Sequence, residues 1–266
     1  MTAAFVAEWR KVLTTRMWWV LGLAAFGYML FLGVVMGFAL THPGVGNGGG
    51  PVAVQGRPAA ETVYTLAASL GYAFPLVIGA LAVTGEFRHR TITPTLLVEP
   101  RRGVVLAAKL LVMLVVGAGF GVVGTGGAVL GGAPLLALSG DGAFLGDGRV
   151  LLDLGCSVLA LALWAVVGVG VGSLLTNQVA AVVVILAFTQ FVEPILRLGL
   201  GAVDALAGVS KYLPGAAAEA LAGSSFYSTA GMAGLLGRWQ GGLVLLGYAV
   251  LLATLGRVTT LRRDVG

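Results

Sequence analysis

The chain has 266 residues, of which 58% are hydrophobic and only 10% are charged, with a net charge of +5 and a mean hydropathy of +0.98. Soluble domains carry about 25% charged residues, so this composition excludes a soluble globular protein and indicates an integral membrane protein. The 43 glycines favour closely packed membrane helices, because small residues let two backbones approach each other. The basic residues flank apolar segments, so orientation in a membrane explains the positive charge better than nucleic-acid binding does.

Residues 2–16 have the pattern of an amphipathic helix that lies in the membrane interface. Its apolar side chains recur at helical spacing at Phe5, Trp9 and Val12. Its polar side chains fall mostly on the other side, at Glu8, Arg10, Lys11 and Thr15. The alternative is a frayed, charged start of the first membrane span. Trp9, Trp18 and Trp19 favour the interfacial helix because tryptophan anchors helices at the membrane surface.

Six apolar stretches are long enough, or nearly so, to cross the roughly 30 Å of bilayer hydrocarbon as helices. They are residues 17–40, 63–84, 104–130, 150–175, 179–196 and 239–257. The predicted fold is therefore an all-α integral membrane protein, with residues 1–266 forming a single transmembrane domain. Six spans place both termini on the same side. Eleven of the 16 Lys and Arg residues lie on that side, so the positive-inside rule predicts cytoplasmic termini in the cell membrane.

The connections between spans differ in kind. Residues 41–62 and 131–149 are rich in Gly and predict flexible outer turns. Only residues 176–178 separate spans four and five, so we expect these two helices to form a tight antiparallel hairpin.

The long outer segment at residues 197–238 is moderately apolar, and Pro214-Gly215 divides it into two short pieces. Neither piece is long enough to cross a membrane. We expect a hairpin of two short helices that dips into the outer leaflet. Two further spans are the alternative, but they would place Lys211 and Glu219 at membrane depth.

Sequence motifs indicate no nucleotide, metal or catalytic site in the chain itself. Gly119, Gly121 and Gly124 match the dinucleotide pattern GxGxxG, but they lie in the middle of a span instead of after a strand. No GxxxxGK[ST] loop occurs, and both histidines, His42 and His89, lie outside the spans. We expect the glycine pairs to serve helix packing instead: Gly117/Gly121, Gly127/Gly131 and Gly168/Gly172.

Polar residues inside the predicted spans are sparse, and such residues are functional candidates by default. Gln190 and Glu193 lie near the outer end of span five, which makes them candidates for a transport pathway or an outer gate. Alternatively, Glu193 pairs with Arg197 four residues later. No series of acidic residues crosses the membrane, which argues against a proton-coupled carrier.

Residues 85–109 form a charged segment between two apolar spans. Its charged side chains are Glu86, Arg88, Arg90, Glu99, Arg101, Arg102 and Lys109. Inside this segment, residues 91–98 offer three apolar side chains: Ile92, Leu96 and Leu97. The positive-inside rule explains the arginines but not an apolar patch in a loop of this kind, and such a patch indicates a partner surface.

The spacing of Glu86, Thr91, Leu96-Leu97, Pro100, Arg101 and Lys109 resembles the loop between spans two and three of the ABC type-2 permease family. The N-terminal helix, the six spans and the outer segment around residues 212–215 agree with that family. Two positions depart from its pattern. Arg90 stands before Thr91, where members often have glycine, and Arg101 stands before Arg102, where a small residue is common.

The resemblance implies the membrane subunit of an exporter for a hydrophobic or amphiphilic substrate. In that family the loop contains a coupling helix that docks on a separate ATP-binding subunit. Two such subunits would bind ATP and Mg²⁺, and a second permease, identical or related, would complete the path. The residues implied in docking are Glu86, Arg88, Arg90, Thr91, Ile92, Leu96, Leu97 and Arg101. The alternatives are a secondary carrier or non-transport scaffold and, more remotely, an intramembrane protease that uses Glu86 and His89.

Overall fold

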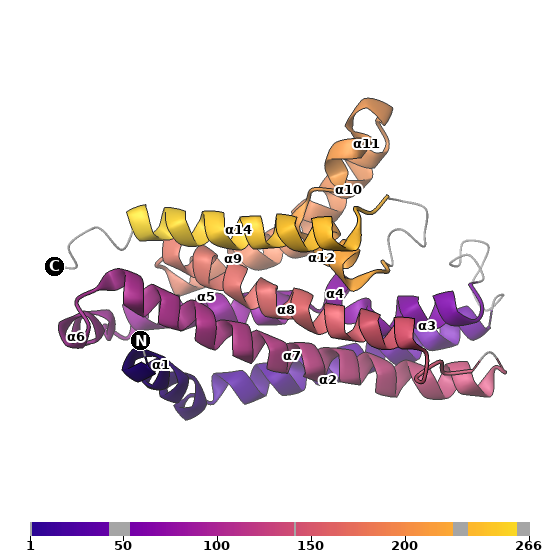
Figure 1. Cartoon of the computed structure of the whole chain (residues 1–266), viewed down its shortest axis with the longest axis horizontal. Helices are drawn as coiled ribbons and strands as arrows, with labels where there is room; N and C mark the ends of the chain where they lie inside the picture. The colour runs from indigo at the N-terminus through magenta and orange to yellow at the C-terminus, as the bar shows by residue number, and fades with distance from the viewer. Residues whose placement is uncertain (1, 43–53, 141, 226–233, 260–266) are drawn as a thin grey trace.

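The computed structural model describes residues 2–42, 54–140, 142–225 and 234–259, and within these ranges it contains helices and no strands. Six helical segments in this described part are long and apolar enough to cross a membrane. They are Met17–Thr41 (α2), Arg57–Arg88, Arg102–Leu138 (α7), Gly148–Leu174 (α8), Gln178–Gly201 and Arg238–Thr259 (α14). The predicted number of spans is confirmed, and the chain is a multi-pass membrane protein. Figure 1 shows these helices as one elongated bundle.

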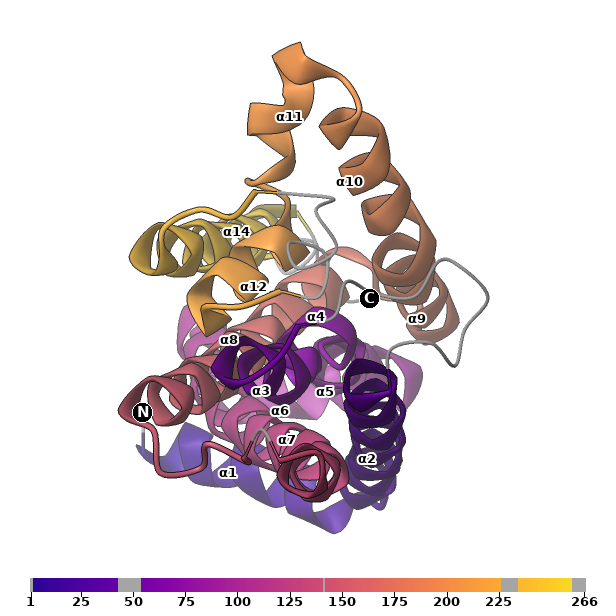
Figure 2. The same cartoon turned by 90° about the vertical axis from the view of Figure 1, so that its right-hand side faces the viewer.

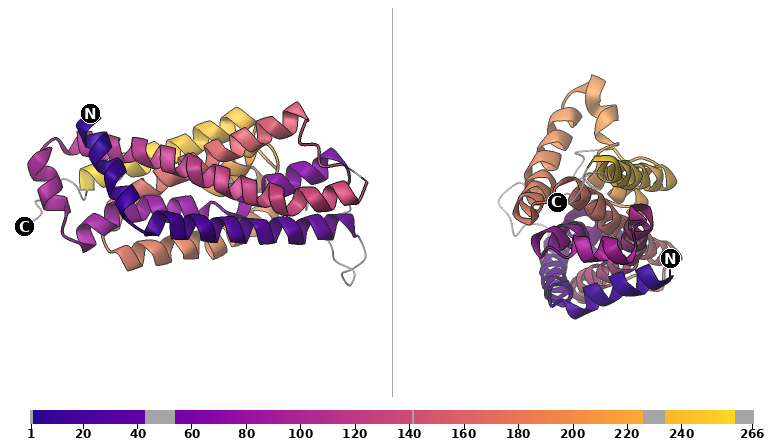
Figure 3. Two further views of the ribbon diagram at one scale, coloured as in Figure 1. Left: turned by 90° about the horizontal axis from the view of Figure 1, so that it is seen from below. Right: turned by 90° about the vertical axis from the view of Figure 1, so that its left-hand side faces the viewer.

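Two short helices lie outside the spans at one end of the bundle. The first, α1 (Thr2–Thr14), precedes α2, and the second, α6 (Ile92–Val98), stands between the second and third spans. The last turns of α14 reach the same end, on the left of Figure 1, which we call the α6 end. Figure 3 shows that α1 crosses the bundle obliquely. Its apolar face is formed by Phe5, Trp9 and Val12, as predicted, and this face packs on the bundle core.

The second span is not the continuous helix predicted over residues 63–84. It consists of α3 (Arg57–Tyr64), α4 (Leu66–Leu70) and α5 (Ala73–Arg88). Pro75 explains the second break, because proline has no backbone N–H and is tolerated only in the first turn of a helix. At this break the ring of Tyr72 stacks on the buried Trp164 of α8 at a centroid distance of 4.5 Å.

The fifth span is also irregular. It begins as α9 (Gln178–Ala187), widens into a π-helical turn (Phe188–Val192) and continues as α10 (Glu193–Gly201). Pro194 cannot donate a backbone hydrogen bond, which accounts for the irregular turn before it. The expectation of a tight hairpin between spans four and five is wrong, because α9 packs mainly against α5 and hardly against α8. Figure 2 shows α9 and α10 leaning away from the bundle.

The outer segment contains two short helices, α11 (Asp204–Ser210) and α12 (Pro214–Ala222). They do not form the expected hairpin, because α11 packs against α10 whereas α12 packs against α14, α8 and α4. Every residue of α12 is buried. Figure 1 places α12 part-way along the bundle, while α10 and α11 project from its side. Glu219 on α12 is therefore buried among the spans, where the sequence had not placed it.

The predicted glycine contacts are confirmed. A Cβ added at Gly117 or Gly121 would meet α8, one at Gly127 or Gly131 would meet α2, and one at Gly168 or Gly172 would meet α5. The closest approach is between α5 and α8, where a Cβ on Gly79 would overlap the carbonyl oxygen of Ala165.

We expect Gly79→Ala to lower the unfolding temperature of the detergent-solubilised protein, because α5 and α8 would have to separate. Overpacking of this kind costs about 1–3 kcal/mol. The matched control is Gly27→Ala on α2, where the added Cβ would meet nothing within 4 Å. That variant should unfold no earlier than the wild type, since alanine favours helix more than glycine does. Equal unfolding temperatures for the two variants would contradict the close contact.

Candidate functional site

The backbone before α6 turns sharply. Arg90 has φ +54°, in the left-handed region that glycine adopts without a steric penalty. The N–H of Thr91 donates to the carbonyl oxygen of Glu86 at 2.9 Å, which closes the turn. Arg90 is one of the two positions at which the sequence departs from the permease pattern. It stands where members of that family often have glycine, and glycine would adopt this backbone conformation without a steric penalty.

The apolar residues of α6 do not share one environment. Ile92 is buried, with 4% of its surface exposed, so it holds α6 to the bundle and is not free to anchor a partner as the sequence suggested. Leu97 is 79% exposed and Val98 is 88% exposed. The side chain of Leu96 lies outside the described part of the structure. Leu97 and Val98, which we call the α6 tip, are therefore the exposed apolar side chains among the described side chains of α6.

Exposed arginines stand in the chain before and after α6. Arg101 donates from Nε to Oε1 of Glu99 at 2.9 Å, and this hydrogen bond lowers the pKa of the Glu99 carboxyl. Arg88 and Arg90 are exposed at the end of α5, and Arg88 donates to the side-chain oxygen of Gln178 at 3.4 Å. The segment therefore carries an exposed apolar α6 tip and exposed arginines on both sides of α6 in the sequence.

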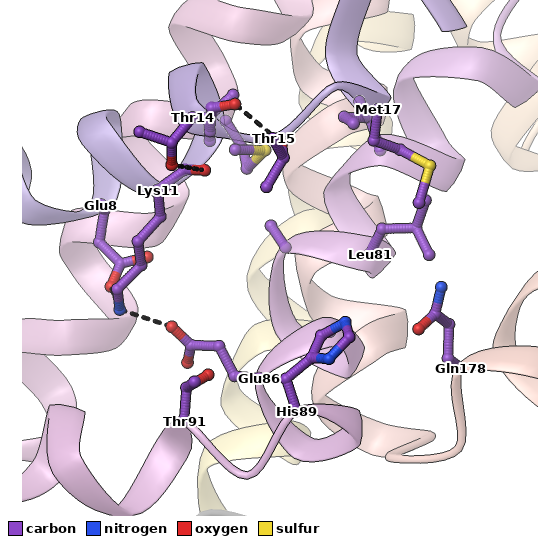
Figure 4. A pocket seen from close by; sticks show the side chains of 15 residues that line it. Glu8, Lys11, Thr14, Thr15, Met17, Leu81, Glu86, His89, Thr91 and Gln178 are labelled. Atoms are coloured by element: carbon purple, nitrogen blue, oxygen red, sulfur yellow. Dashed lines mark hydrogen bonds and ion pairs between the residues drawn. The ribbon is translucent and has the colours of Figure 1, made fainter. Parts of the chain in front are cut away.

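Glu86, in contrast, is only 6% exposed. It is part of a set of four charged side chains that we call the ion-pair cluster: Glu8, Lys11, Glu86 and Lys109. Lys109 Nζ lies 2.5 Å from Glu8 Oε2 and 2.9 Å from Glu86 Oε1. Lys11 Nζ lies 2.6 Å from Glu8 Oε1 and 2.6 Å from Glu86 Oε1. Figure 4 shows Lys11 reaching from α1 to Glu86 on α5.

The ion-pair cluster joins four helices. Glu8 and Lys11 come from α1, Glu86 from α5 and Lys109 from α7, while Lys11 Nζ also donates to Thr95 Oγ1 of α6 at 3.1 Å. Two positive and two negative charges balance, as buried charges require. Ile92, Thr95 and the turn at Arg90 thus connect α6 to the bundle, and Lys11 links it to the other helices of the cluster.

Lys11 stays charged in this setting. Burial alone would lower the pKa of Lys11, but the hydrogen bonds and charges of Glu8 and Glu86 outweigh burial and raise it above 10.5. A raised lysine pKa contributes stability that is complete below the unfolded-state pKa and is lost only as the pH rises through the folded-state value. Lys11 therefore keeps its positive charge throughout the physiological range.

Sequence reasoning did not find this cluster. It placed Glu8 on the polar side of α1, whereas the structure buries Glu8 with 5% of its surface exposed. One signal was present: Lys109 lies within the predicted span at residues 104–130, and a lysine at such a position needs a partner. One partner is Glu8, which is 101 residues away in the sequence, so the tertiary fold decides which carboxylate pairs with Lys109.

We expect Lys109→Met to destabilise the protein by about 3–5 kcal/mol, because it leaves two buried carboxylates with a single lysine. The contacts that hold α1 would weaken, so limited proteolysis should cut α1 faster than in the wild type. Arg10→Met provides the control, since Arg10 is exposed on the same helix. Equal cleavage of α1 in both variants would contradict this role for the cluster.

A second buried polar site lies where α10, α12 and α5 meet, and we call Glu193, Arg197 and Glu219 the buried triad. The predicted pairing is confirmed, with Arg197 Nη2 2.9 Å from Glu193 Oε1. Arg197 Nη1 lies equally close, at 2.9 Å, to Glu219 Oε1. All three are at most 3% exposed.

Neighbouring groups complete the hydrogen bonds of this triad. The N–H of Gly215 donates to Glu193 Oε1 at 2.6 Å, and the hydroxyl of Tyr72 donates to Glu193 Oε2 at 3.4 Å. Ser225 donates to Glu219. Gln190, the other pathway candidate, is exposed, so the structure does not bring it together with Glu193.

The described residues contain no group of three or more His, Cys, Asp or Glu side chains that could hold a metal ion. The chain matches no protein-family model, and no curated protein matches its sequence. The α6 tip, the ion-pair cluster and the buried triad are the features from which a function can be argued.

Proposed function

We propose that the chain is the membrane permease subunit of an ATP-binding cassette exporter. The observation that carries the proposal is the α6 tip: two apolar side chains, Leu97 and Val98, are almost fully exposed on a helix whose opposite side is anchored in the bundle. An exposed apolar tip followed directly by the charged pair Glu99 and Arg101 has the composition of a protein-binding surface. We assign the occupant as a separate ATP-binding subunit, because the loop carries the spacing of the type-2 permeases.

The anchoring of α6 supports this assignment. A surface that only holds a partner needs no rigid connection to the spans. Here Thr95 and Ile92 fix α6, and the ion-pair cluster joins it to α1, α5 and α7. Closure of an ATP-binding subunit around ATP would push on α6 and move these helices as one body.

The complete transporter would contain two ATP-binding subunits and a second permease, identical or related to this chain. ATP and Mg²⁺ would be bound by the partner subunits, since the sequence carries no P-loop. A hydrophobic or amphiphilic substrate would cross between the permeases. The α6 end would face the cytoplasm of the cell, because most of the basic residues flank that end, and a reporter fused to the C terminus would then be active only in its cytoplasmic form.

The alternative functions require other properties of the α6 tip and of Glu86. A secondary carrier or a non-transport scaffold would need no soluble partner at the α6 tip. An intramembrane protease would use Glu86 together with His89, whereas the ion pairs of Glu86 are with Lys11 and Lys109. No structural observation favours either alternative over the exporter subunit.

The test is reconstitution with an ATP-binding protein that carries P-loop motifs and is encoded beside this chain. We expect the two to co-purify, and we expect ATP hydrolysis in proteoliposomes to exceed that of the ATP-binding protein alone. The control is the same ATP-binding protein with its P-loop lysine replaced, which should bind but not hydrolyse. Absence of both association and stimulation would overturn the proposal.

A further inference from the structure

A cavity of about 370 Å³ lies beside the ion-pair cluster. Ligand pockets in proteins range from about 300 to 1,000 Å³, so this volume admits a small molecule or part of a larger one. The cavity lies among α1, α5, α7 and the first residues of α2 and α9. Met17, the first residue of the first span, forms part of its wall, so the cavity lies at the depth where that span begins.

The walls of the cavity are amphipathic. Ile78, Leu81 and Met113 supply apolar surface from the spans. Thr15, His89 and Gln178 supply polar groups. Figure 4 shows His89 beside Glu86, Gln178 farther away below Leu81, and Thr15 and Met17 above the space. A molecule that fits both kinds of wall has a polar head and an apolar tail.

The hydrogen bonding of Glu86, one of the residues that line the cavity, indicates which head group the cavity would bind. Glu86 Oε1 accepts from both lysines of the cluster, whereas Glu86 Oε2 is buried and accepts no hydrogen bond from the described residues. A buried acceptor without a donor carries a desolvation penalty that a ligand donor removes. An ammonium or amine head meets this need, whereas an anionic head would place a further negative charge beside the carboxylate. Lys11 also lines the cavity, but its charge is already paired with Glu8 and Glu86.

We propose that this cavity binds an amphiphile with a primary amine head group. The amine donates to Glu86 Oε2, and the tail lies against Ile78, Leu81 and Met113. Such a head occurs both in aminophospholipids of the membrane and in cationic amphiphiles that reach the membrane as free molecules. The inference concerns this chain alone and does not require the ATP-binding partner.

The chain offers a substitution that occupies the cavity and leaves all four residues of the ion-pair cluster unchanged. Gly85 lines the cavity, and a Cβ added there would meet nothing within 4 Å. Gly85→Leu therefore places a side chain in the space without a backbone clash. Gly119→Leu is the matched control, because Gly119 is an exposed helical glycine on α7 whose added Cβ would also meet nothing within 4 Å.

The experiment uses the purified full chain in nanodiscs of equal phosphatidylethanolamine and phosphatidylcholine. Retained lipid is counted by native mass spectrometry after mild detergent release. We expect the wild type and Gly119→Leu to retain the ethanolamine lipid in roughly ten-fold preference, the effect of one hydrogen bond to a charged group. Gly85→Leu should lose this retention, and Glu86→Gln should keep lipid but lose the preference.

Dodecylamine added as a competitor separates the two sources of the amine. Displacement of the ethanolamine lipid by dodecylamine supports a site that reads the amine in any amphiphile. Retention of the lipid without displacement supports a site for bilayer aminophospholipid. Equal retention of both lipids by the wild type, or unchanged retention in Gly85→Leu, would overturn the inference. None of these outcomes depends on ATP hydrolysis, so failure here and failure of the exporter proposal are distinguishable.

Discussion

Leu97→Asp and Val98→Asp are each expected to weaken binding of the ATP-binding subunit by roughly 30-fold, the affinity change that about 2 kcal/mol produces. Both side chains are almost fully exposed in the isolated chain, so the substitutions remove no internal contact and should leave the permease folded. A carboxylate placed at the α6 tip must lose its water when the tip enters a groove of the partner, which opposes docking. Binding is measured by biolayer interferometry on nanodiscs that contain the permease.

The matched control for the α6 tip is Leu138→Asp. Leu138 ends α7 at the opposite end of the bundle and is 84% exposed, so the chemical change and the exposure are alike and only the location differs. This variant should bind the partner as the wild type does. Equal loss of binding in Leu138→Asp, or full binding in both tip variants, would show that α6 does not dock.

Arg197→Met should destabilise the folded protein by about 3–5 kcal/mol, the penalty for leaving buried charges without their partner. Arg197 is 3% exposed and holds both Glu193 and Glu219, so its loss leaves two carboxylates facing each other in the bundle. The change is measured as the unfolding temperature in one detergent. We expect Glu193→Gln/Arg197→Met/Glu219→Gln to recover most of the loss, because it removes the uncompensated charges.

Arg57→Met is the comparison for Arg197→Met. Arg57 also contacts two carboxylates, those of Glu61 and Asp147, but its side chain is 40% exposed. Ion pairs of this exposure contribute about 0–1 kcal/mol, so the unfolding temperature should hardly change. Similar decreases in the unfolding temperature for Arg197→Met and Arg57→Met would mean that burial does not determine how much the ion pairs of the triad contribute to stability.

Long apolar segments gave the correct number of spans, because hydrocarbon thickness fixes how long an apolar helix must be. The helical spacing of Phe5, Trp9 and Val12 predicted α1, and the resemblance to the permease loop implied α6. Pro194 indicated a bend in the fifth span, whereas the break before Pro75 was missed, because length and composition do not register a missing backbone donor. The environment of a single side chain was harder still. Ile92 and Leu97 are equally apolar in the sequence, yet one is buried and the other exposed, which depends on how the turn at Arg90 orients α6.

In the polar sites, the ion pair between residues close in the sequence could be predicted, whereas the ion pairs between distant residues could not. The Glu193–Arg197 pair was foreseen because its members are four residues apart on one helix. Glu219 joined that pair only through the fold, since α12 packs between spans that are distant in the sequence. Glu8 and Lys109 likewise form their ion pair only because α1 packs on α7.

The break in the second span has a mechanical consequence. Glu86 lies near one end of α5 in the ion-pair cluster, and Tyr72 precedes the other end and donates to Glu193 of the buried triad. The 16 residues of α5 therefore form a rod of about 24 Å, with an ion-pair cluster at one end and a hydrogen bond to a buried carboxylate beside the other. Since the helix is interrupted before Ala73, this rod is a helical segment separate from α3 and α4. A displacement at the ATP-binding subunit would then reach the far half of the membrane through one helix and a single phenol hydroxyl.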